Sequence, residues 1–171
     1  MNFINIEIKA KCFHPQQVEA FLLQHHAKFI GVDEQKDIYF NVHHGRLKLR
    51  QGNIENNLIF YNRPNQEGPK QSNFLLVPVA DGNAMQQILS ASLGIKVVVE
   101  KKRKIFFIEN VKFHIDEVKN LGSFVEIEAG NKNFPDKTVN QLQQQCNAYM
   151  QQLGIKNEDL ISNSYSDMLL P

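Results

Sequence analysis

The sequence predicts an α+β protein built on a closed antiparallel eight-stranded β-barrel with helices packed outside. Three observations support this fold. Short segments of alternating apolar and polar residues recur along the chain, which is the pattern of strands with one apolar face. Brief turns join most of them, which favours antiparallel pairing. On three of four such strands the polar face carries charges of one sign, which would repel in an open sheet but can enclose a ligand in a closed one.

The N-terminal part begins with a predicted strand over 3–11, whose isoleucines alternate with polar residues. Its polar face carries Asn5, Glu7, Lys9 and Lys11. Pro15 suits the first turn of a helix, and Gly31 is a plausible end for it. Residues 35–42 and 46–50 predict a hairpin. Its second strand alternates strictly and places Arg46, Lys48 and Arg50 on one face.

The remaining elements follow the same logic. Strands are predicted over 58–62 and 73–79, and Asp81 caps a helix that ends at Gly94. A strand over 96–108 carries Lys101 and Arg103 in phase. Two short strands then lie within 112–128, around Asn120 and Gly122. A helix starting at Pro135–Asp136 and a tail over 157–171 complete the chain, and we expect the apolar tail to dock on the domain.

Composition limits the classes of function. With 171 residues, we expect a single domain over 1–171. The chain has 19 Lys and Arg against 18 Asp and Glu, a balance that argues against a nucleic-acid or membrane-surface binder. It shows no membrane-spanning run and no signal peptide. Cys12 and Cys146 are isolated, so we expect free thiols and a cytoplasmic protein.

Three carboxylates converge in the predicted sheet. Glu126 and Glu128 lie two residues apart and so share a strand face, and Asp116 on the preceding strand could reach the same side. Oxygen ligands of this kind suit Mg²⁺ or Mn²⁺. A solvent-exposed strand with an acidic face has the same local pattern. The cations on the other strands require an anionic ligand. A polyphosphate with a divalent metal satisfies both groups of charge.

Several segments together resemble the CYTH family, whose members include class IV adenylate cyclases, thiamine triphosphatases and inorganic tripolyphosphatases. They are Glu7-Ile-Lys9, His44-Gly-Arg46-Leu-Lys48-Leu-Arg50, Lys101-x-Arg103, and the run from His114 to Glu128. The resemblance is strongest over 4–130, and residues 35–40 look nearest the class IV cyclase-like branch. It departs at Asn5, where the family signature Glu-x-Glu-x-Lys has its first glutamate, and at 72–79, where many relatives carry an arginine and a glutamate.

The resemblance implies a triphosphate tunnel with Mg²⁺ or Mn²⁺ as cofactor and gives candidate roles to individual residues. The expected metal ligands are Glu7, Asp116, Glu126 and Glu128. The expected substrate-binding residues are Lys9, Lys11, Arg46, Lys48, Arg50, Arg63, Lys101 and Arg103, of which Lys9, Lys101 and Arg103 are also the catalytic candidates. We interpret the adjacent histidine pairs at 25–26 and 43–44 as structural, and His114 likewise, although the nearby Asp116 leaves open that His114 lies close to the site.

Three functions share this cavity. The first is cyclisation of ATP to cyclic AMP and pyrophosphate, and the second is hydrolysis of thiamine triphosphate or tripolyphosphate. The third is binding of a nucleotide or polyphosphate without turnover, which the neutral Asn5 would suit. The expected partner is the small-molecule triphosphate, with no nucleic acid or membrane, and a homodimer is one option for assembly. A lysine, a carboxylate and bulk solvent all remain candidates for the proton acceptor.

Overall fold

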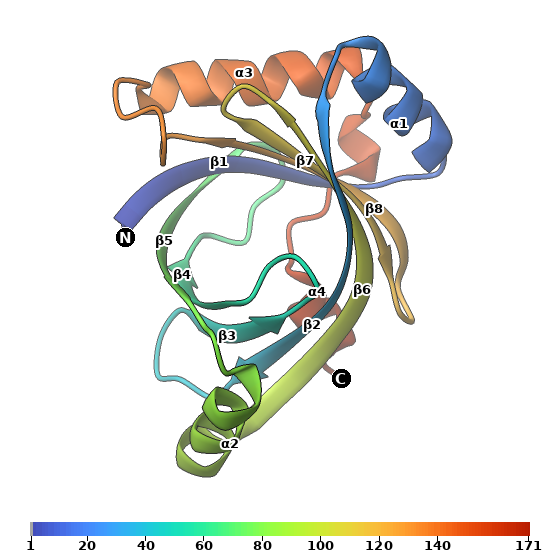
Figure 1. Cartoon of the computed structure of the whole chain (residues 1–171). Coiled ribbons are helices and arrows are strands. Elements are labelled where there is room, and N and C mark those ends of the chain that lie inside the picture. Colours follow the sequence, from blue (N-terminus) through green and yellow to red (C-terminus); the bar gives the residue numbers. More distant parts are fainter. Residues whose placement is uncertain (1) are drawn as a thin grey trace.

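Eight strands close into one antiparallel barrel in the computed structural model of the chain, which describes residues 2–171 (Figure 1). Around the barrel the order is β1-β5-β4-β3-β2-β6-β7-β8, and every neighbouring pair is antiparallel. The strands are β1 (Asn2–Lys11), β2 (Lys28–Phe40), β3 (Arg46–Gln51), β4 (Asn57–Asn62), β5 (Lys70–Pro78), β6 (Ile95–Ile108), β7 (Val111–Val118) and β8 (Gly122–Gly130). The predicted fold class is confirmed.

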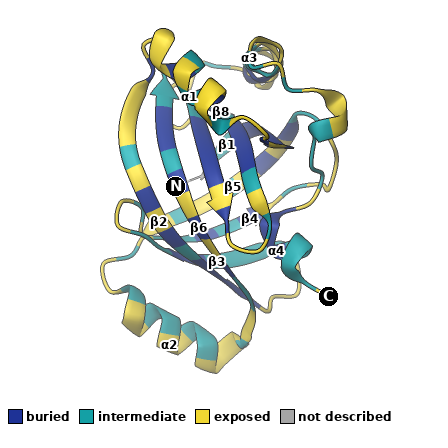
Figure 2. Cartoon of the chain, turned by 90° about the vertical axis from the view of Figure 1, so that its right-hand side faces the viewer, coloured by how far each residue is buried: buried dark blue, intermediate teal, exposed yellow. Residues whose placement is uncertain are grey.

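The alternation along β1 shows how the sequence separates an apolar exterior from a charged interior. Ile6 and Ile8 are buried in a core formed with α3 (Val139–Gln152), where they lie in one cluster with Leu142. Glu7 and Lys9 point to the other side and line a cavity inside the barrel. Figure 2 shows the resulting dark-blue stretches on β1 and β8 beneath the helices. Burying the aliphatic face against a helix thus obliges the charged face to turn inward.

Two helices cover one side of the barrel and one covers the opposite end. α1 (Pro15–Gln24) lies over β7 and β8, and α3 lies over β1 and β8 (Figure 1). α2 (Gly82–Leu93) lies against β2 and β3, and none of its described residues is buried (Figure 2). Asp81 caps α2 by accepting a hydrogen bond from the Ala84 amide, as predicted. Among the described residues, no helix has the length and apolar character needed to cross a membrane.

Two predicted helix limits are wrong. α1 ends at Gln24, and Gly31 instead lies inside β2, where the pairing with β6 shifts register between Phe29 and Gly31. Its φ of 149° suits a glycine at such a bulge. α3 begins at Val139 and not near Pro135, because Thr138 and Gln141 form a capping box that starts the helix there.

The C-terminal tail docks on the barrel, as predicted, and contributes to its interior. After the 3₁₀ turn Asn157–Asp159, the Ile161 amide donates a hydrogen bond to the Lys9 carbonyl at 2.9 Å. The short helix α4 (Tyr165–Leu169) follows and lies against β6. Tyr165 is only 4% exposed and packs on Phe124 with ring centroids 5.0 Å apart. α4 therefore differs from the other helices in supplying a side chain to the barrel interior.

We predict that Phe113→Ala lowers the free energy of unfolding by about 3–5 kcal/mol, because it removes a fully buried aromatic ring between β7 and α3. The Phe113 ring meets Tyr149 of α3 edge-to-face at 4.9 Å. Phe13→Ala is the matched control, since Phe13 is 70% exposed and its loss should change stability by no more than about 0.5 kcal/mol. Urea unfolding of both variants measures the difference, and equal effects would contradict the assigned core.

Candidate active site

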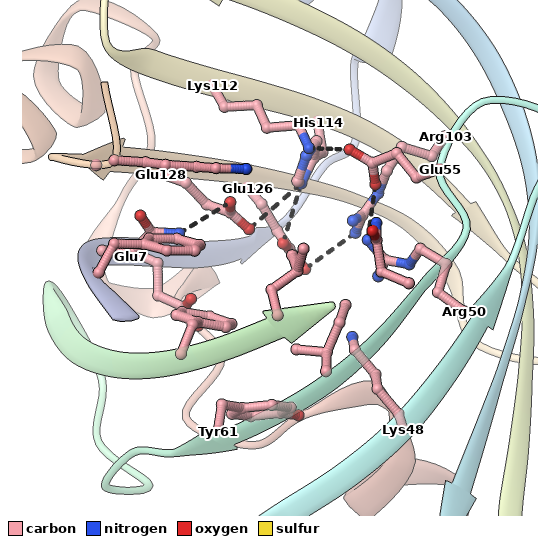
Figure 3. Close-up of a pocket in the computed structure, with 18 of the residues that line it drawn as sticks. Glu7, Lys48, Arg50, Glu55, Tyr61, Arg103, Lys112, His114, Glu126 and Glu128 are labelled. Atoms are coloured by element: carbon pink, nitrogen blue, oxygen red, sulfur yellow. Dashed lines mark hydrogen bonds and ion pairs between the residues drawn. The ribbon is translucent and has the colours of Figure 1, made fainter. Parts of the chain in front are cut away.

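The barrel encloses a cavity of about 450 Å³ whose wall is highly charged. Its described lining includes eight Lys or Arg side chains: Lys9, Lys48, Arg50, Arg63, Lys101, Arg103, Lys112 and Lys132. Five glutamates also line it: Glu7, Glu55, Glu109, Glu126 and Glu128. Figure 3 shows Glu126 and Glu128 beside His114, and Lys48 and Arg50 on a separate stretch of wall. The cavity therefore combines anionic ligands for a cation with an excess of cations for an anion.

A carboxylate–histidine cluster forms one part of this wall. His114 Nδ1 lies 3.2 Å from Glu126 Oε2 and 3.7 Å from Glu128 Oε1 (Figure 3). The register of β7 and β8 places His114 directly opposite Glu126. The ring of His114 lines the cavity, which agrees with the proximity to the site that the nearby Asp116 left open. The signal available in the sequence was that His114 and Asp116 share one strand face.

Glu126 also binds the cations beside it. Its Oε1 lies 3.3 Å from Lys9 Nζ and 3.5 Å from the Arg103 guanidinium. Burial alone would raise the pKa of Glu126, but Lys9 and Arg103 outweigh burial and hold this pKa well below its usual range. Glu126 is therefore ionised at neutral pH and can act as a ligand.

Two of the predicted metal ligands have other partners. Asp116 is fully buried behind the wall, and its two oxygens accept hydrogen bonds from Arg103 at 2.7 and 2.6 Å. The Tyr165 hydroxyl donates a further hydrogen bond to Asp116 at 2.7 Å. Asp116 thus positions Arg103, and both of its oxygens accept hydrogen bonds, so its role as a metal ligand stays a prediction. Glu7 does line the cavity, but its carboxylate forms an ion pair with Arg63.

Three cations share one buried carboxylate on a different part of the wall. Asp37 of β2 accepts two hydrogen bonds from Arg50 at 2.8 Å each, and one each from Lys101 at 2.9 Å and Lys48 at 3.1 Å. Burial opposes ionisation of Asp37, but the three cations hold its pKa well below the usual range. Sequence reasoning missed Asp37, although Asp33, Gln35 and Asp37 alternate along the strand. The phase of these three residues was the available signal.

One carboxylate cannot neutralise three cations, and Lys101 shows the consequence. Burial, together with Arg103, Arg50 and Lys48, lowers the pKa of Lys101 to about 7, although Asp37 acts in the opposite direction. Lys101 can therefore give up its proton near neutral pH, whereas the Arg50 guanidinium stays protonated. An entering polyanion would supply the negative charge that this group lacks.

The other predicted substrate-binding residues are divided between the cavity and its surroundings. Arg63 lines the cavity, but Lys11 at the end of β1 is exposed and does not. Arg46 also lies outside the described lining, where its guanidinium binds Asp167 of α4 at 2.7 Å and Asn65 at 3.1 Å. The alternation of β1 and β3 placed Lys11 and Arg46 on the inner face but could not show that these residues lie at the strand ends.

Glu55 and Lys112 are cavity residues that sequence reasoning missed. Glu55 lies in the connection between β3 and β4, accepts a hydrogen bond from Arg50 at 2.9 Å and forms an ion pair with Lys112 of β7. Burial would raise the pKa of Glu55, but Lys112 and Arg50 hold it well below its usual range. A glutamate in a connecting segment has no strand phase, so alternation could not identify it.

The cavity also has an aromatic part. The Phe3 and Phe74 rings stack with centroids 5.6 Å apart and planes 8° apart, and Tyr61 continues the stack from Phe74 at 5.5 Å. Phe107 and Phe134 complete this part of the lining. Phe3 precedes Asn5 by two residues on β1 and so shares its strand face. Phe107 on β6 lies opposite Lys112 on β7. This end therefore adjoins Glu128, which pairs with both Glu7 and Lys112.

The donor atoms present suit a divalent metal. Among the described residues, His114, Glu126 and Glu128 each offer one ligand atom, and these three atoms lie within 4.8 Å of one another. Ligands about 2.1 Å from one ion lie about 3.0–3.4 Å apart, so small side-chain movements would complete such a site. His114 Nε2 is buried and has no hydrogen-bond partner among the described residues. Two glutamate side chains and an imidazole together offer donor atoms that fit a cation.

Comparisons with known proteins agree with this geometry. A family model described as the CYTH domain matches residues 4–165. The putative adenylate cyclase MJ0240 of Methanocaldococcus jannaschii is 29% identical over 179 residues, which cover 96% of this chain and 98% of that protein. The structure of PH1012 from Pyrococcus horikoshii OT3 has a TM-score of 0.80 at 23% identity, with 97% of this chain and 99% of that chain covered.

A second solved structure shares the fold at lower identity. It is the putative adenylyl cyclase HpAC1 from Hippeastrum, which is described as having a dominant triphosphatase activity. Its TM-score is 0.64 at 14% identity, and the match covers 99% of this chain and 98% of that chain. These comparisons confirm the family resemblance seen in the sequence.

We predict that tripolyphosphate raises the melting temperature of the wild type more than that of Lys48→Gln. The substitution removes one of three cations around Asp37, so without ligand the variant should be as stable as the wild type or slightly more stable. A tenfold loss of affinity would remove about 1.4 kcal/mol of ligand-dependent stabilisation. Lys102→Gln is the control, because Lys102 points outward on β6 and is 64% exposed. Equal thermal shifts in all three proteins at fixed ionic strength would contradict the phosphate-binding wall.

We also predict that tripolyphosphate binding takes up a proton through Lys101 above about pH 7. The empty site holds the pKa of Lys101 at about 7, and a bound anion favours the charged amine and raises this pKa. Affinity should therefore fall more steeply with rising pH in the wild type than in Lys101→Arg, whose guanidinium stays protonated. Calorimetry at pH 8 in buffers with different heats of ionisation measures proton uptake. Because protonation of the ligand is common to both proteins, equal uptake would refute the role of Lys101.

Proposed function

This chain belongs to the CYTH domain family, and we propose that it is a metal-dependent enzyme that acts on an organic triphosphate. The first candidate reaction is cyclisation of ATP to cyclic AMP and pyrophosphate. The observation that carries the proposal is that the Glu126–Glu128–His114 cluster lies in the same barrel cavity as a group of cations that lacks sufficient negative charge. A metal ion would neutralise the carboxylate cluster, and a polyphosphate would neutralise the group of cations.

The cations on the wall provide the phosphate-binding groups. Arg103 is held in place by Asp116 through two hydrogen bonds, and Arg50 is held by Asp37 in the same way. Guanidinium groups fixed in this manner lose little conformational freedom when phosphate oxygens bind. Lys9, Lys48 and Lys101 add point charges around them. A metal held by Glu126 and Glu128 would further neutralise the phosphate charge and orient the phosphoryl groups.

The order of groups along the strands supports reaction at the α-phosphorus. From the aromatic end inward, register gives a row with Glu128 and Lys112, then a row with His114 and Glu126, and then Arg103 opposite Asp116. An organic group stacked at the aromatic end would place the α-phosphate near the carboxylates and the two outer phosphates near the deeper cations. In cyclisation the ribose 3′-oxygen bonds to the α-phosphorus, the bond to the bridging oxygen breaks, and the 3′-hydroxyl proton passes to an acceptor. The deeper cations would bind the departing pyrophosphate.

Hydrolysis at the terminal phosphorus is the second candidate. The fold is shared with HpAC1 from Hippeastrum, a protein described as having a dominant triphosphatase activity. In this reaction a water oxygen attacks the terminal phosphorus, and the same cations stabilise the negative charge that develops. The two reactions use one cavity and differ in which phosphorus faces the nucleophile.

The test is to incubate the protein with ATP, thiamine triphosphate and tripolyphosphate, each with Mg²⁺ and with Mn²⁺, and to separate cyclic AMP, pyrophosphate and orthophosphate. We expect the organic triphosphates to react faster than tripolyphosphate, and ATP to give cyclic AMP. Orthophosphate as the main product would favour hydrolysis, and tight binding without turnover under all conditions would overturn the enzymatic proposal.

We predict that Glu128→Gln reduces turnover at least about 100-fold and leaves the fold intact. Its described contacts are few, namely Asn5 at 3.5 Å and His114 at 3.7 Å, so its loss should leave the barrel stable. Glu117→Gln on β7 removes an equivalent charge from an exposed position and should keep wild-type activity. Full activity of Glu128→Gln would show that Glu128 does not hold the metal.

A further inference from the structure

We propose that His114 binds the metal directly, with Glu126 and Glu128, and that this nitrogen donor makes the site select a first-row transition cation such as Mn²⁺ over Mg²⁺. The inference concerns the cavity of the proposed function and rests on that function only for the presence of a metal. It is carried by the geometry of the three side chains and by the use of their remaining atoms.

The three ligand atoms converge from two neighbouring strands. His114 Nδ1 on β7 faces Glu126 Oε2 at 3.2 Å and Glu128 Oε1 at 3.7 Å, both on β8. Donors around one ion at about 2.1 Å lie about 3.0–3.4 Å apart, close to the two separations from His114, and all three donor atoms lie within 4.8 Å of one another. The imidazole is only 1% exposed and lines the cavity, so its ring is fixed against the two carboxylates (Figure 3).

The other oxygen of each carboxylate is bound elsewhere, which orients the free atoms toward one point. Glu126 Oε1 faces Lys9 at 3.3 Å and Arg103 at 3.5 Å, away from the histidine contact. Glu128 Oε2 accepts a hydrogen bond from the Asn5 side-chain amide at 3.5 Å. Partners of this kind orient the ligands of metal sites in proteins. The cluster is therefore a set of three oriented donors, which an acidic patch on a surface is not.

The proposal also accounts for Asn5 at a position where the family signature has glutamate. A third carboxylate beside Glu128 would add negative charge and favour hard cations, whereas the Asn5 amide donates a hydrogen bond to Glu128. Gly130 allows this, because a Cβ at residue 130 would clash with the Asn5 side-chain oxygen. The site thus has one charged oxygen ligand fewer and one nitrogen ligand more. Imidazole suits first-row transition metals better than Mg²⁺, which prefers oxygen and retains water.

The test measures metal binding without substrate. Calorimetric titration with Mn²⁺ and Mg²⁺ at fixed pH should give tighter Mn²⁺ binding to the wild type. His114→Asn should weaken Mn²⁺ binding at least about tenfold and change Mg²⁺ binding much less. His43→Asn is the matched control, because His43 is exposed in the turn before β3, and should leave both affinities unchanged. Unchanged affinities in His114→Asn, or an equal loss for both metals, would overturn the proposal.

A spectroscopic measurement covers the case in which His114→Asn does not fold. Electron spin echo envelope modulation of Mn²⁺ bound to the wild-type protein detects a directly coordinated nitrogen, and ¹⁵N-labelling of histidine should alter that signal. Bound Mn²⁺ without nitrogen modulation would refute the role of His114 while leaving the proposed enzymatic function intact. Nitrogen-bound Mn²⁺ in a protein that turns over no triphosphate would instead refute the function and leave this inference standing.

Discussion

Two buried carboxylates, Asp37 and Asp116, hold the cations inside the barrel, and the rest of the cavity depends on them. An unpaired charge in such an interior costs several kcal/mol, so a closed barrel with a basic inner face requires internal anions. β6 lies between the strands that supply them, with Lys101 bound to Asp37 of β2 and Arg103 bound to Asp116 of β7. The pairing fixes the cations but does not neutralise them. The remaining positive charge is what makes the cavity suited to a polyanion.

The carboxylates of the interior therefore divide into two kinds. Asp37 and Asp116 have both oxygens bound to cations and serve the architecture. The polar side-chain contacts of Glu128 among residues 2–171 are an amide and an imidazole. Glu126 has one oxygen beside cations and the other beside His114. Negative charge that lacks a matching cation thus gathers at one place. That place adjoins the aromatic end of the cavity, so a metal site, a phosphate-binding wall and a surface for an organic group follow one another along the barrel.

The sequence was sufficient for the barrel and for the inward faces of β1, β3, β6 and β8, because strand alternation reports directly on which face a residue occupies. It was not sufficient for partners. Asp37 meets Lys101 across 64 positions of sequence, and this contact depends on β2 lying beside β6. His114 became a candidate ligand only when register placed it opposite Glu126. Sequence reasoning missed Glu55 for a different reason, because Glu55 lies in a connecting segment that has no strand alternation.

Alternation also says nothing about depth, and depth decides which inward residues belong to the site. Lys11 is exposed at the end of β1, while Arg46 lies at the start of β3 and binds Asp167 of α4. The docked tail occupies that region, and the Tyr165 ring lies 3.8 Å from Lys9 Nζ while its hydroxyl binds Asp116. The tail thus supplies to the interior a group that strand periodicity cannot reveal. Fewer residues at the strand ends can therefore contact a triphosphate than charge patterning alone indicates. At the centre of the barrel, more residues can do so.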